Sequence, residues 1–362
     1  MKTIDGHAHL YGGVDGIPAL AETARKLGFA RMNIAAIPSP AVINTNPAAF
    51  AAKARHPELF YFFAGLDHAE LATRGAAKSP PLAEQAGRLA ALGADGFKLL
   101  EAKPTGRKWL GRPVDGPYFA EFFARAERLG LPLLWHTADP EEFWEPARTP
   151  QWAVSRGWAY DGSFLPKETH YAEVERVLER HPGLKVILPH FYFLSADLER
   201  AERFLARFPN ACFDLAPGVE LVYNLSRDPA AARDFFVRHA GRIVFGTDIG
   251  ILPDMTLRQA ERRAGLVLRF LTTADEFGAD PEADFLLEPP PGSVGRGLAL
   301  PEDVLEKILA GNFERLAGAA PRPLDRALAR EECLRLAKSF EALPGEKPAA
   351  LHPARAAEAL DA

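Results

Sequence analysis

Short runs of apolar residues alternate along this chain with longer segments in which apolar residues recur at helical spacing. Eight short runs are strand candidates, because they are rich in β-branched and aromatic residues. In order they read TIDGHAHL, ARMNIAAI, FYFFAGLD, GFKLLE, LPLLWH, LKVILPH, ACFDLA and RIVFGTD. Strands that are apolar on both faces are typical of parallel sheets covered by helices. Eight alternations of strand and helix are the number that closes a (β/α)8 barrel, so the pattern predicts an α/β TIM barrel.

A weak internal repeat supports the barrel. The segments RHPELF, RHPGLK, RFPNAC and RHAGRI each end a helical segment and open a strand, and we interpret them as the helix-to-strand turns at the bottom of the barrel. The histidines of these turns, His56, His181 and His239, are therefore expected to be structural. His190 and Asp248 each lie ten residues after the arginine that opens such a turn. Both should emerge at the C-terminal rim, where barrel active sites lie.

The same pattern predicts the domain organisation. We expect a single barrel over residues 1–320 and a C-terminal helical extension and tail over 321–362. The segment 137–167, after the fifth strand, is much longer than a usual βα loop and is predicted to be a lid loop. Residues 270–300 break the helical periodicity with proline and glycine, which indicates an insertion over the rim or side.

Composition narrows the class of protein. The chain is 48% hydrophobic and 25% charged with a net charge of -5, which is typical of a globular protein and gives no electrostatic signature of nucleic-acid binding. The first hydrophobic stretch contains Asp5, His7 and His9 and so does not resemble a secretory leader. Two cysteines far apart cannot form a disulfide framework. We therefore expect a cytoplasmic protein with no membrane span.

Polar residues stand where apolar strand interiors do not explain them. His7 and His9 are two residues apart, so on a strand both imidazoles point to the same face. The fifth, sixth and eighth strand candidates end at His136, His190 and Asp248. An unpartnered polar group there would cost about 1–3 kcal/mol. Each residue alone could be a hydrogen-bonded core residue, but four imidazoles and one carboxylate at one rim favour a divalent metal ion, Zn²⁺ first and Mn, Fe or Co next.

This order of motifs resembles the amidohydrolase superfamily, specifically the family 2 metal-dependent hydrolases and decarboxylases. The resemblance runs from TIDGHAHL through IVFGTD to EKILAGNFERL. It implies that His7, His9, His136 and Asp248 are ligands of one metal ion. It also implies that His190 is a further ligand, or the imidazole that holds and polarises the bound water or substrate.

The resemblance leaves two interpretations of Lys98, in GFKLLE. Some members of the superfamily carry a carboxylated lysine here that holds a second metal. The other interpretation is a free lysine that binds a substrate carboxylate or pairs with Glu101. Asp5 is likewise open: it could orient a ligand imidazole or be a hydrogen-bonded carboxylate of the barrel.

Aromatic residues around the predicted metal site are candidates for substrate contact. Trp144, Trp152 and Trp158 in the predicted lid could wall a pocket for a planar organic substrate or form a small core of the lid. Phe191, in the FYF segment after His190, is a second candidate wall.

The resemblance implies hydrolysis of an amide, ester or lactone of a small organic acid. Asp248 would take the proton of a metal-activated water, and His190 would steady the developing oxyanion. A non-oxidative decarboxylase of an aromatic or unsaturated acid is the alternative on the same site. A non-catalytic metal-binding barrel is less favoured because the ligand set is complete, and a nuclease or phosphatase is disfavoured by the acidic charge. The expected partner is a small-molecule organic acid, and a homodimer is compatible with the family.

Overall fold

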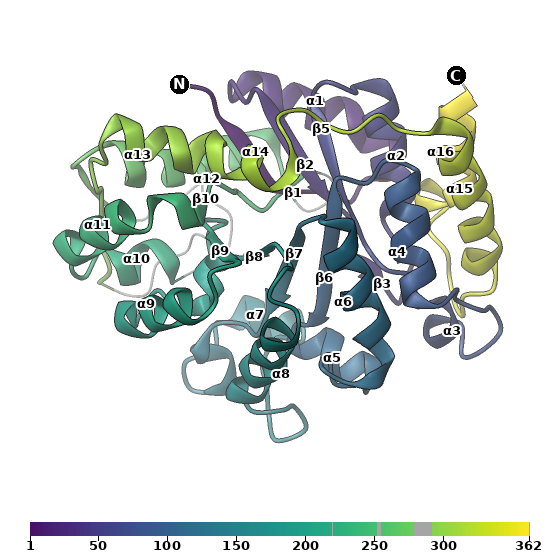
Figure 1. The fold of residues 1–362 in the computed structure, drawn as a ribbon, viewed down its shortest axis with the longest axis horizontal. Coiled ribbons are helices and arrows are strands. Elements are labelled where there is room, and N and C mark those ends of the chain that lie inside the picture. Colours follow the sequence, from purple (N-terminus) through teal and green to yellow (C-terminus); the bar gives the residue numbers. More distant parts are fainter. Residues whose placement is uncertain (219, 252–254, 279–291, 362) are drawn as a thin grey trace.

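A parallel sheet of nine strands forms the centre of the protein (Figure 1). The computed structural model describes residues 1–218, 220–251, 255–278 and 292–361. The sheet order is β10-β9-β8-β7-β6-β5-β2-β1-β11. The strands are β1 Ile4–Leu10, β2 Arg31–Ala35, β5 Phe60–Ala64, β6 Gly96–Ala102, β7 Leu133–Thr137, β8 Val186–Leu188, β9 Ala211–Asp214, β10 Ile243–Val244 and β11 Ile249–Ile251. All eight predicted strands are present, and the fold is the predicted α/β TIM barrel.

The barrel closes between its first and last strands. The predicted eighth strand is divided into β10, which pairs with β9, and β11, which runs parallel to β1. Between them, Gly6 N donates to Phe245 O at 2.9 Å and Asp248 N donates to His7 O at 2.7 Å. The residues that join the two ends of the sheet are therefore neighbours of the predicted metal ligands.

Helices connect consecutive strands and cover the outside of the sheet (Figure 1). The connecting helices are α1 Ile17–Lys26, α2 Asn46–Arg55, α4 Leu82–Ala91, α6 Pro117–Leu129, α8 Lys167–Arg180, α9 Leu198–Arg207 and α11 Pro229–Arg238. Shorter helices lie in the loops: α3 Ala69–Ala72, α5 Pro104–Leu110, α7 Gln151–Ser155 and α10 Leu221–Leu225. After β11 come α12 Leu257–Thr272, α13 Glu302–Glu306, α14 Asn312–Ala317, α15 Arg326–Glu341 and α16 Pro353–Asp361. Among the described helices, none combines the length and apolarity that a membrane crossing needs.

Each strand buries both of its faces, as the apolar runs predict. The outward side chains pack with the helices in a large core, whereas the inward side chains form a second cluster inside the barrel. The inner cluster includes Tyr61 and Phe63 of β5, Leu134 of β7 and Cys212 of β9, and Phe313 of α14 packs among them. By alternation, His136 and Asp214 continue the inward faces of β7 and β9.

An irregularity in β1 brings its histidines inward. Ile4 belongs to the inner cluster and Ala8 to the outer core, although an uninterrupted strand would place both on one face. The register between β1 and β2 shifts between Asp5 and Ala8. Such a bulge changes which residues face inward. Because of the bulge, Ile4 at the start of β1 packs in the inner cluster, and His7 and His9 nearer its end also face the interior of the barrel.

The predicted additions to the barrel have defined structure where they are described. The predicted lid, 137–167, contains a 3-10 turn at Glu141–Trp144 and α7. The predicted insertion, 270–300, lies partly outside the described residues; its ends form a hairpin of β12 Glu276–Phe277 and β13 Gly295–Arg296. A second hairpin, β3 Pro38–Ser39 with β4 Ile43–Asn44, follows β2. In the C-terminal extension, α15 and α16 pack beside α2 (Figure 1).

Candidate metal centre

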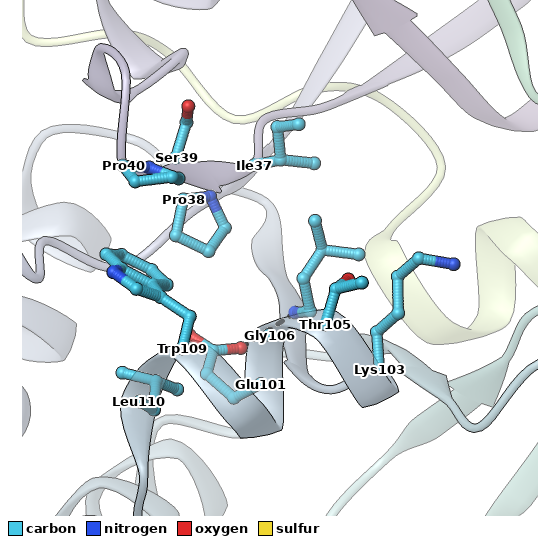
Figure 2. A pocket seen from close by; sticks show the side chains of 11 residues that line it. Ile37, Pro38, Ser39, Pro40, Glu101, Lys103, Thr105, Gly106, Trp109 and Leu110 are labelled. Atoms are coloured by element: carbon cyan, nitrogen blue, oxygen red, sulfur yellow. Dashed lines mark hydrogen bonds between the residues drawn. The ribbon is translucent and has the colours of Figure 1, made fainter. Parts of the chain in front are cut away.

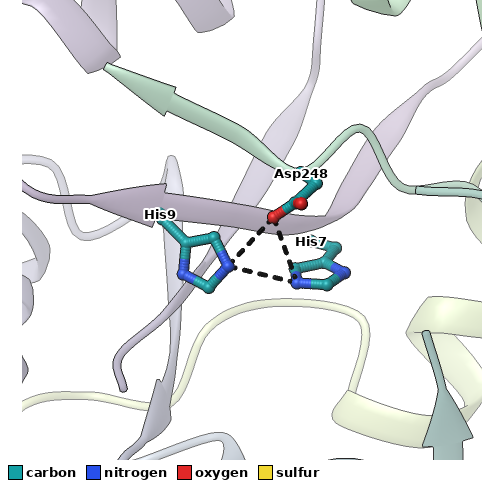
Figure 3. A group of neighbouring side chains, drawn as sticks. All are labelled: His7, His9 and Asp248. Atoms are coloured by element: carbon teal, nitrogen blue, oxygen red, sulfur yellow. Dashed lines mark hydrogen bonds and ion pairs between the residues drawn. The ribbon is translucent and has the colours of Figure 1, made fainter. Parts of the chain in front are cut away.

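Two histidines of β1 and the aspartate before β11 form the candidate metal centre. The Nε2 atoms of His7 and His9 lie 3.2 Å apart, and Asp248 Oδ1 lies 3.0 Å from His9 Nε2 and 3.6 Å from His7 Nε2. Figure 3 shows the three side chains converging on one point. Their ligand atoms all lie within 4.8 Å of one another, so this group could hold one metal ion.

The backbone turns sharply at Asp248 to bring its carboxylate to this point. Asp248 has a φ of 54°, in the left-handed region that residues other than glycine rarely adopt. Its backbone N–H is fixed by His7 O, and its carbonyl accepts a hydrogen bond from Arg263 Nη1. Strained backbone of this kind is retained where the surrounding structure holds it, most often at functional sites.

Hydrogen bonds on the far side of each ring of the β1 pair set which nitrogen is available. His9 Nδ1 donates to Ala35 O at 2.6 Å, and a carbonyl oxygen can only accept. His7 Nδ1 lies 2.8 Å from Asp214 Oδ2. With both Nδ1 atoms protonated, a neutral ring presents the lone pair of Nε2 to the centre. Two such lone pairs beside a carboxylate oxygen make an arrangement that a cation stabilises, so the residues fit a metal ion.

The pKa shifts of His7 and Asp248 also favour metal binding at the centre. Burial, followed by the nearby Lys98, holds the pKa of His7 well below its ordinary value, so this ring is neutral. Burial alone would raise the pKa of Asp248, but His7 and His9 outweigh it and hold that pKa well below its usual range. A neutral imidazole and an ionised carboxylate are the forms in which these residues bind metals.

Asp214, at the end of β9, belongs to the site but was not predicted from the sequence. It is fully buried; its Oδ2 faces His7 Nδ1, and its Oδ1 accepts from His190 N at 2.8 Å and Ala216 N at 3.0 Å. The signal was present, because Asp214 is the polar residue of an otherwise apolar strand. Asp5, by contrast, contacts no imidazole among the described residues: its carboxylate accepts from Thr247 Oγ1 and from the backbone N–H of His7 and Thr247.

Lys98 lies beneath the centre on β6. Its Nζ is 3.1 Å from His7 Nε2, and its side chain is buried. Burial lowers its pKa to about 8. The pairing with Glu101 that the sequence suggested is not formed; Glu101 instead accepts from His68 Nε2 at 2.9 Å. Lys98 therefore faces the metal centre rather than the cavities above it.

His190 follows β8 in a left-handed turn. Residues 190–193 all have φ between 52° and 57°, and His190 Nδ1 donates to Ala216 O at 2.9 Å. The His190 and His7 rings lie 5.6 Å apart, and burial lowers the pKa of His190 to about 4. The turn also changes the predicted aromatic wall. Phe191 is fully buried against Phe213, Phe235 and Phe236, whereas Phe193 lines a cavity next to His190.

His136, at the end of β7, is near the centre but outside the three-residue group. Its ring lies 5.0 Å from that of His190. Its Nε2 is 3.1 Å from Ala138 O, an acceptor, and 3.2 Å from Asp139 Oδ1. In this arrangement Nε2 carries the proton, so Nδ1 holds the lone pair unless the ring rotates. The role of His136 as a ligand remains a prediction.

A small cavity opens from the centre toward the predicted lid. It is lined by Lys103, His136, Asp139, Pro140, Phe143, Trp152, Trp158, His190, Phe193, Pro217, Gly218 and Asp248. Lys103 Nζ donates to both oxygens of Asp139 and lies 4.4 Å from the centre of the Trp158 ring. Trp144 does not line this cavity; its indole N–H donates to Leu165 O. The aromatic residues around Phe143 and Tyr160 form a small core of their own, one face of which walls the cavity.

The family of the chain follows from comparison with known sequences. The sequence model of a family described as Amidohydrolase matches residues 4–318. The chain belongs to the amidohydrolase family. In this amidohydrolase, the match begins with β1 and ends just after α14, so it contains every residue of the candidate centre and leaves α15 and α16 outside. No curated protein sequence matches the chain significantly.

Solved structures share the fold of this amidohydrolase. A TIM-barrel protein from Bordetella bronchiseptica is 16% identical, with 87% of this chain and 98% of that chain covered and a TM-score of 0.50. A protein from Acinetobacter baumannii, described as a probable 2-pyrone-4,6-dicarboxylic acid hydrolase and solved with citric acid, is 12% identical (88% and 100% covered, TM-score 0.50). The 4-oxalomesaconate hydratase of Rhodopseudomonas palustris is 13% identical (92% and 99% covered, TM-score 0.50). At these identities the likeness shows the fold alone.

Proposed function

We propose that this amidohydrolase is a metal-dependent hydrolase that acts on an amide, ester or lactone of a small organic acid. The observation that carries the proposal is the convergence of His7 Nε2, His9 Nε2 and Asp248 Oδ1 on one point. Imidazole nitrogens and a carboxylate oxygen suit Zn²⁺ best, and Mn, Fe or Co less well. We assign His7, His9 and Asp248 as ligands, with His136 as a fourth.

The metal would supply Lewis acidity and, when bound, would bring the pKa of a water molecule down to about 7. In this proposed hydrolysis, Asp248 and Asp214 have separate roles. Asp248 is ionised and borders the small cavity, so its carboxylate can accept the proton of an attacking water and return it to the leaving group. Asp214 holds His7 in the orientation and protonation state that a ligand needs.

The hydrogen bond made by His190 supports a different task from the one that the sequence suggested for this residue. Because its Nδ1 donates to Ala216 O and its ring is neutral, its Nε2 offers a lone pair and no proton. Such an atom cannot steady an oxyanion. We assign His190 Nε2 instead as an acceptor that orients the attacking water, or as an additional ligand. The Trp152 and Trp158 side chains would exclude bulk water from the cavity above it.

The test is metal binding by protein prepared without metal and then titrated with zinc, followed by mass spectrometry of the metal content. We expect the wild type to bind about one equivalent. His9→Ala should lose zinc, and Asp214→Asn should bind it about 10–100-fold more weakly because it no longer orients His7. The matched control is His56→Ala, which removes a histidine from the C-terminal end of α2 and should leave zinc binding unchanged. Failure of the wild type to bind any transition metal would overturn the proposal.

Activity assays on the loaded protein separate the reaction types. Aryl esters, lactones and amides of small carboxylic acids test hydrolysis, and carbon dioxide release from aromatic and unsaturated acids tests decarboxylation. Release of carbon dioxide without hydrolysis would make the protein a lyase. Binding of about two equivalents of zinc would indicate a carboxylated Lys98 that holds a second metal.

A further inference from the structure

A larger cavity lies at the same end of the barrel as the candidate metal centre, between residues 37–40 after β2 and the end of β6 with the following α5. Its volume is about 300 Å³. The lining residues are Ile37, Pro38, Ser39, Pro40, Leu100, Glu101, Lys103, Thr105, Gly106, Trp109 and Leu110 (Figure 2). We call it the β2–β6 cavity. The roles assigned above to the metal centre use none of its walls.

The β2–β6 cavity adjoins the metal centre through the backbone. Ile37 lies two residues after Ala35, whose carbonyl accepts from His9. Leu100 lies two residues after Lys98, whose Nζ contacts His7. Lys103 lines both the β2–β6 cavity and the small cavity that contains Asp248. The β2–β6 cavity and the small cavity at the metal centre therefore share the Lys103 side chain as part of their walls.

The walls of the β2–β6 cavity are mostly apolar. Figure 2 shows the Trp109 indole on the same side as Pro38 and Pro40, with Lys103 on the opposite side. Rigid rings of this kind offer flat apolar contact at small entropic cost. The walls suit a ring or a short hydrocarbon chain.

The β2–β6 cavity also contains one buried acidic group, Glu101. Its side chain is 2% exposed. Its Oε1 accepts from His68 Nε2 at 2.9 Å, and its Oε2 accepts from Leu100 N at 2.7 Å. His68 is itself fixed: its Nδ1 lies 3.1 Å from Tyr118 Oη, and its ring packs edge-on against Trp109 at 5.9 Å. A carboxylate can accept about four hydrogen bonds, so Glu101 has capacity for a ligand.

We propose that the β2–β6 cavity binds an apolar arm of the substrate, and that Glu101 accepts a hydrogen bond from a hydroxyl or amino group on that arm. His68 and Tyr118 keep the Glu101 carboxylate in place, and Trp109 packs against the arm. The assignment of this arm to a substrate rests on the proposed function of the metal centre. The binding of the arm itself depends only on the cavity.

The experiment measures binding of three small probes by ligand-detected NMR and calorimetry, on metal-free and on zinc-loaded protein. Benzyl alcohol and benzylamine each carry a donor on an apolar ring, and toluene has the ring alone. We expect both donor probes to bind more tightly than toluene, equally well with and without zinc. Tighter binding of benzylamine would identify an amino group as the donor, and tighter binding of benzyl alcohol a hydroxyl group.

Two variants locate the probes. Glu101→Gln should weaken benzylamine binding by about tenfold or more, because a charge-assisted hydrogen bond is lost. The matched control is Glu121→Gln, which makes the same change at an exposed position on α6. Thr105→Phe fills the cavity without altering Glu101 and should abolish binding of all three probes. Thermal melting confirms that each variant is folded.

The outcomes distinguish this proposal from the proposed function. If Thr105→Phe leaves probe binding unchanged, or if the donor probes bind no better than toluene, the assignment of the β2–β6 cavity is overturned, and zinc binding by the same samples still tests the proposed function separately. If the probes bind as expected but the wild type takes up no metal, the cavity assignment holds and the proposed hydrolase does not.

Discussion

Three imidazoles, two in the candidate metal centre and one beside it, are each held by a hydrogen bond through Nδ1. The acceptors are Asp214 for His7, Ala35 O for His9 and Ala216 O for His190. Each Nε2 is left to face the interior of the site. Preorganisation of this kind lowers the cost of binding a metal because the ring orientation and the protonation state are already set. The ring of His136 is the exception, since its Nε2 is used within its own loop.

A different buried residue, Glu220, makes the stability of the protein depend on pH. Glu220 is the residue just before α10, and it is 6% exposed. Its carboxylate receives no hydrogen bond from any other described residue. Burial raises its pKa from 4.5 to about 7, and the nearby Glu142 adds to this shift. The protonated form is therefore the one that the folded state favours. The contribution of this pKa shift to the free energy of unfolding is fully present below pH 4.5 and is lost as the pH rises through 7.

We expect Glu220→Gln to be more stable than the wild type at pH 8, by up to about 3 kcal/mol. The difference should vanish near pH 4.5, where the glutamate is also neutral. Urea denaturation of both proteins at several pH values measures it. Glu199→Gln, a change at an exposed position on α9, is the control. A stability difference that does not vary with pH would contradict the assignment.

At the scale of single residues, the sequence predicted the three polar groups that converge, but neither Asp214 nor the groups that hold the histidine rings in place. His7, His9 and Asp248 come together as expected because strand ends meet at one rim. The carbonyl groups that fix the rings carry no signature in the sequence. Phe193, and not the expected Phe191, lines the cavity, because the left-handed turn after β8 could not be predicted from residue types.

At the scale of elements, the helices and strands are tied together by a buried ion pair. Lys53 of α2 donates to Gly93 O and to the carboxylate of Asp95, just before β6. Asp95 also accepts from Phe62 N of β5 and from Arg322 N, at the start of the C-terminal extension. One carboxylate thus joins two strands, a helix and the extension.

We expect Asp95→Asn to lower the free energy of unfolding by about 3–5 kcal/mol, because it leaves the Lys53 ammonium buried without a counter-charge. Adding Lys53→Met to this variant should restore part of the loss, since the uncompensated charge is then removed. Urea denaturation of the two single variants and the double variant gives the coupling between the residues. A double variant that is as unstable as the sum of the single ones would show that the pair is not coupled.

Element boundaries were less predictable than element identity. The sixth predicted strand, LKVILPH, is reduced to Val186–Leu188 because Pro189 lacks an N–H and His190 is left-handed. The eighth is divided because Asp248 is left-handed. In both cases the strand is interrupted at a candidate functional residue, where local backbone preference is overridden.

At the scale of the whole molecule, the C-terminal extension is attached to the rim of the barrel. Leu336 and Phe340 of α15 pack with Val42 and Ile43 of the β3–β4 hairpin. Arg335 Nη1 lies 2.7 Å from Asp67 Oδ2, and Asp67 is 3% exposed. Residues 64–68 lead from β5 to His68, which contacts Glu101 of the β2–β6 cavity. The extension therefore supports one wall of that cavity.

We expect Arg335→Met to lower the free energy of unfolding by about 1–3 kcal/mol, because it leaves the Asp67 carboxylate buried with one partner fewer. Arg330→Met provides the matched control on the same helix: Arg330 pairs with the exposed Asp361 and should contribute less than about 1 kcal/mol. Denaturant unfolding measures both. Equal losses in the two variants would contradict a special role for Arg335.

The sequence indicated the helix of the extension but not where it packs. Its amphipathic pattern is a local property, whereas its contacts with α2 and the β3–β4 hairpin depend on the assembled barrel. The barrel itself was predictable because eight strand–helix units follow one another along the chain.

The placement of the metal centre on the first and last strands of the barrel has a consequence for biosynthesis. His7 and His9 leave the ribosome some 240 residues before Asp248 and the backbone that closes β1 against β11. At a synthesis rate of about 5–20 residues per second, Asp248 is added on the order of ten seconds or more after the two histidines. A nascent chain thus offers no complete site to the metals of its surroundings, and the site is first formed when the barrel closes.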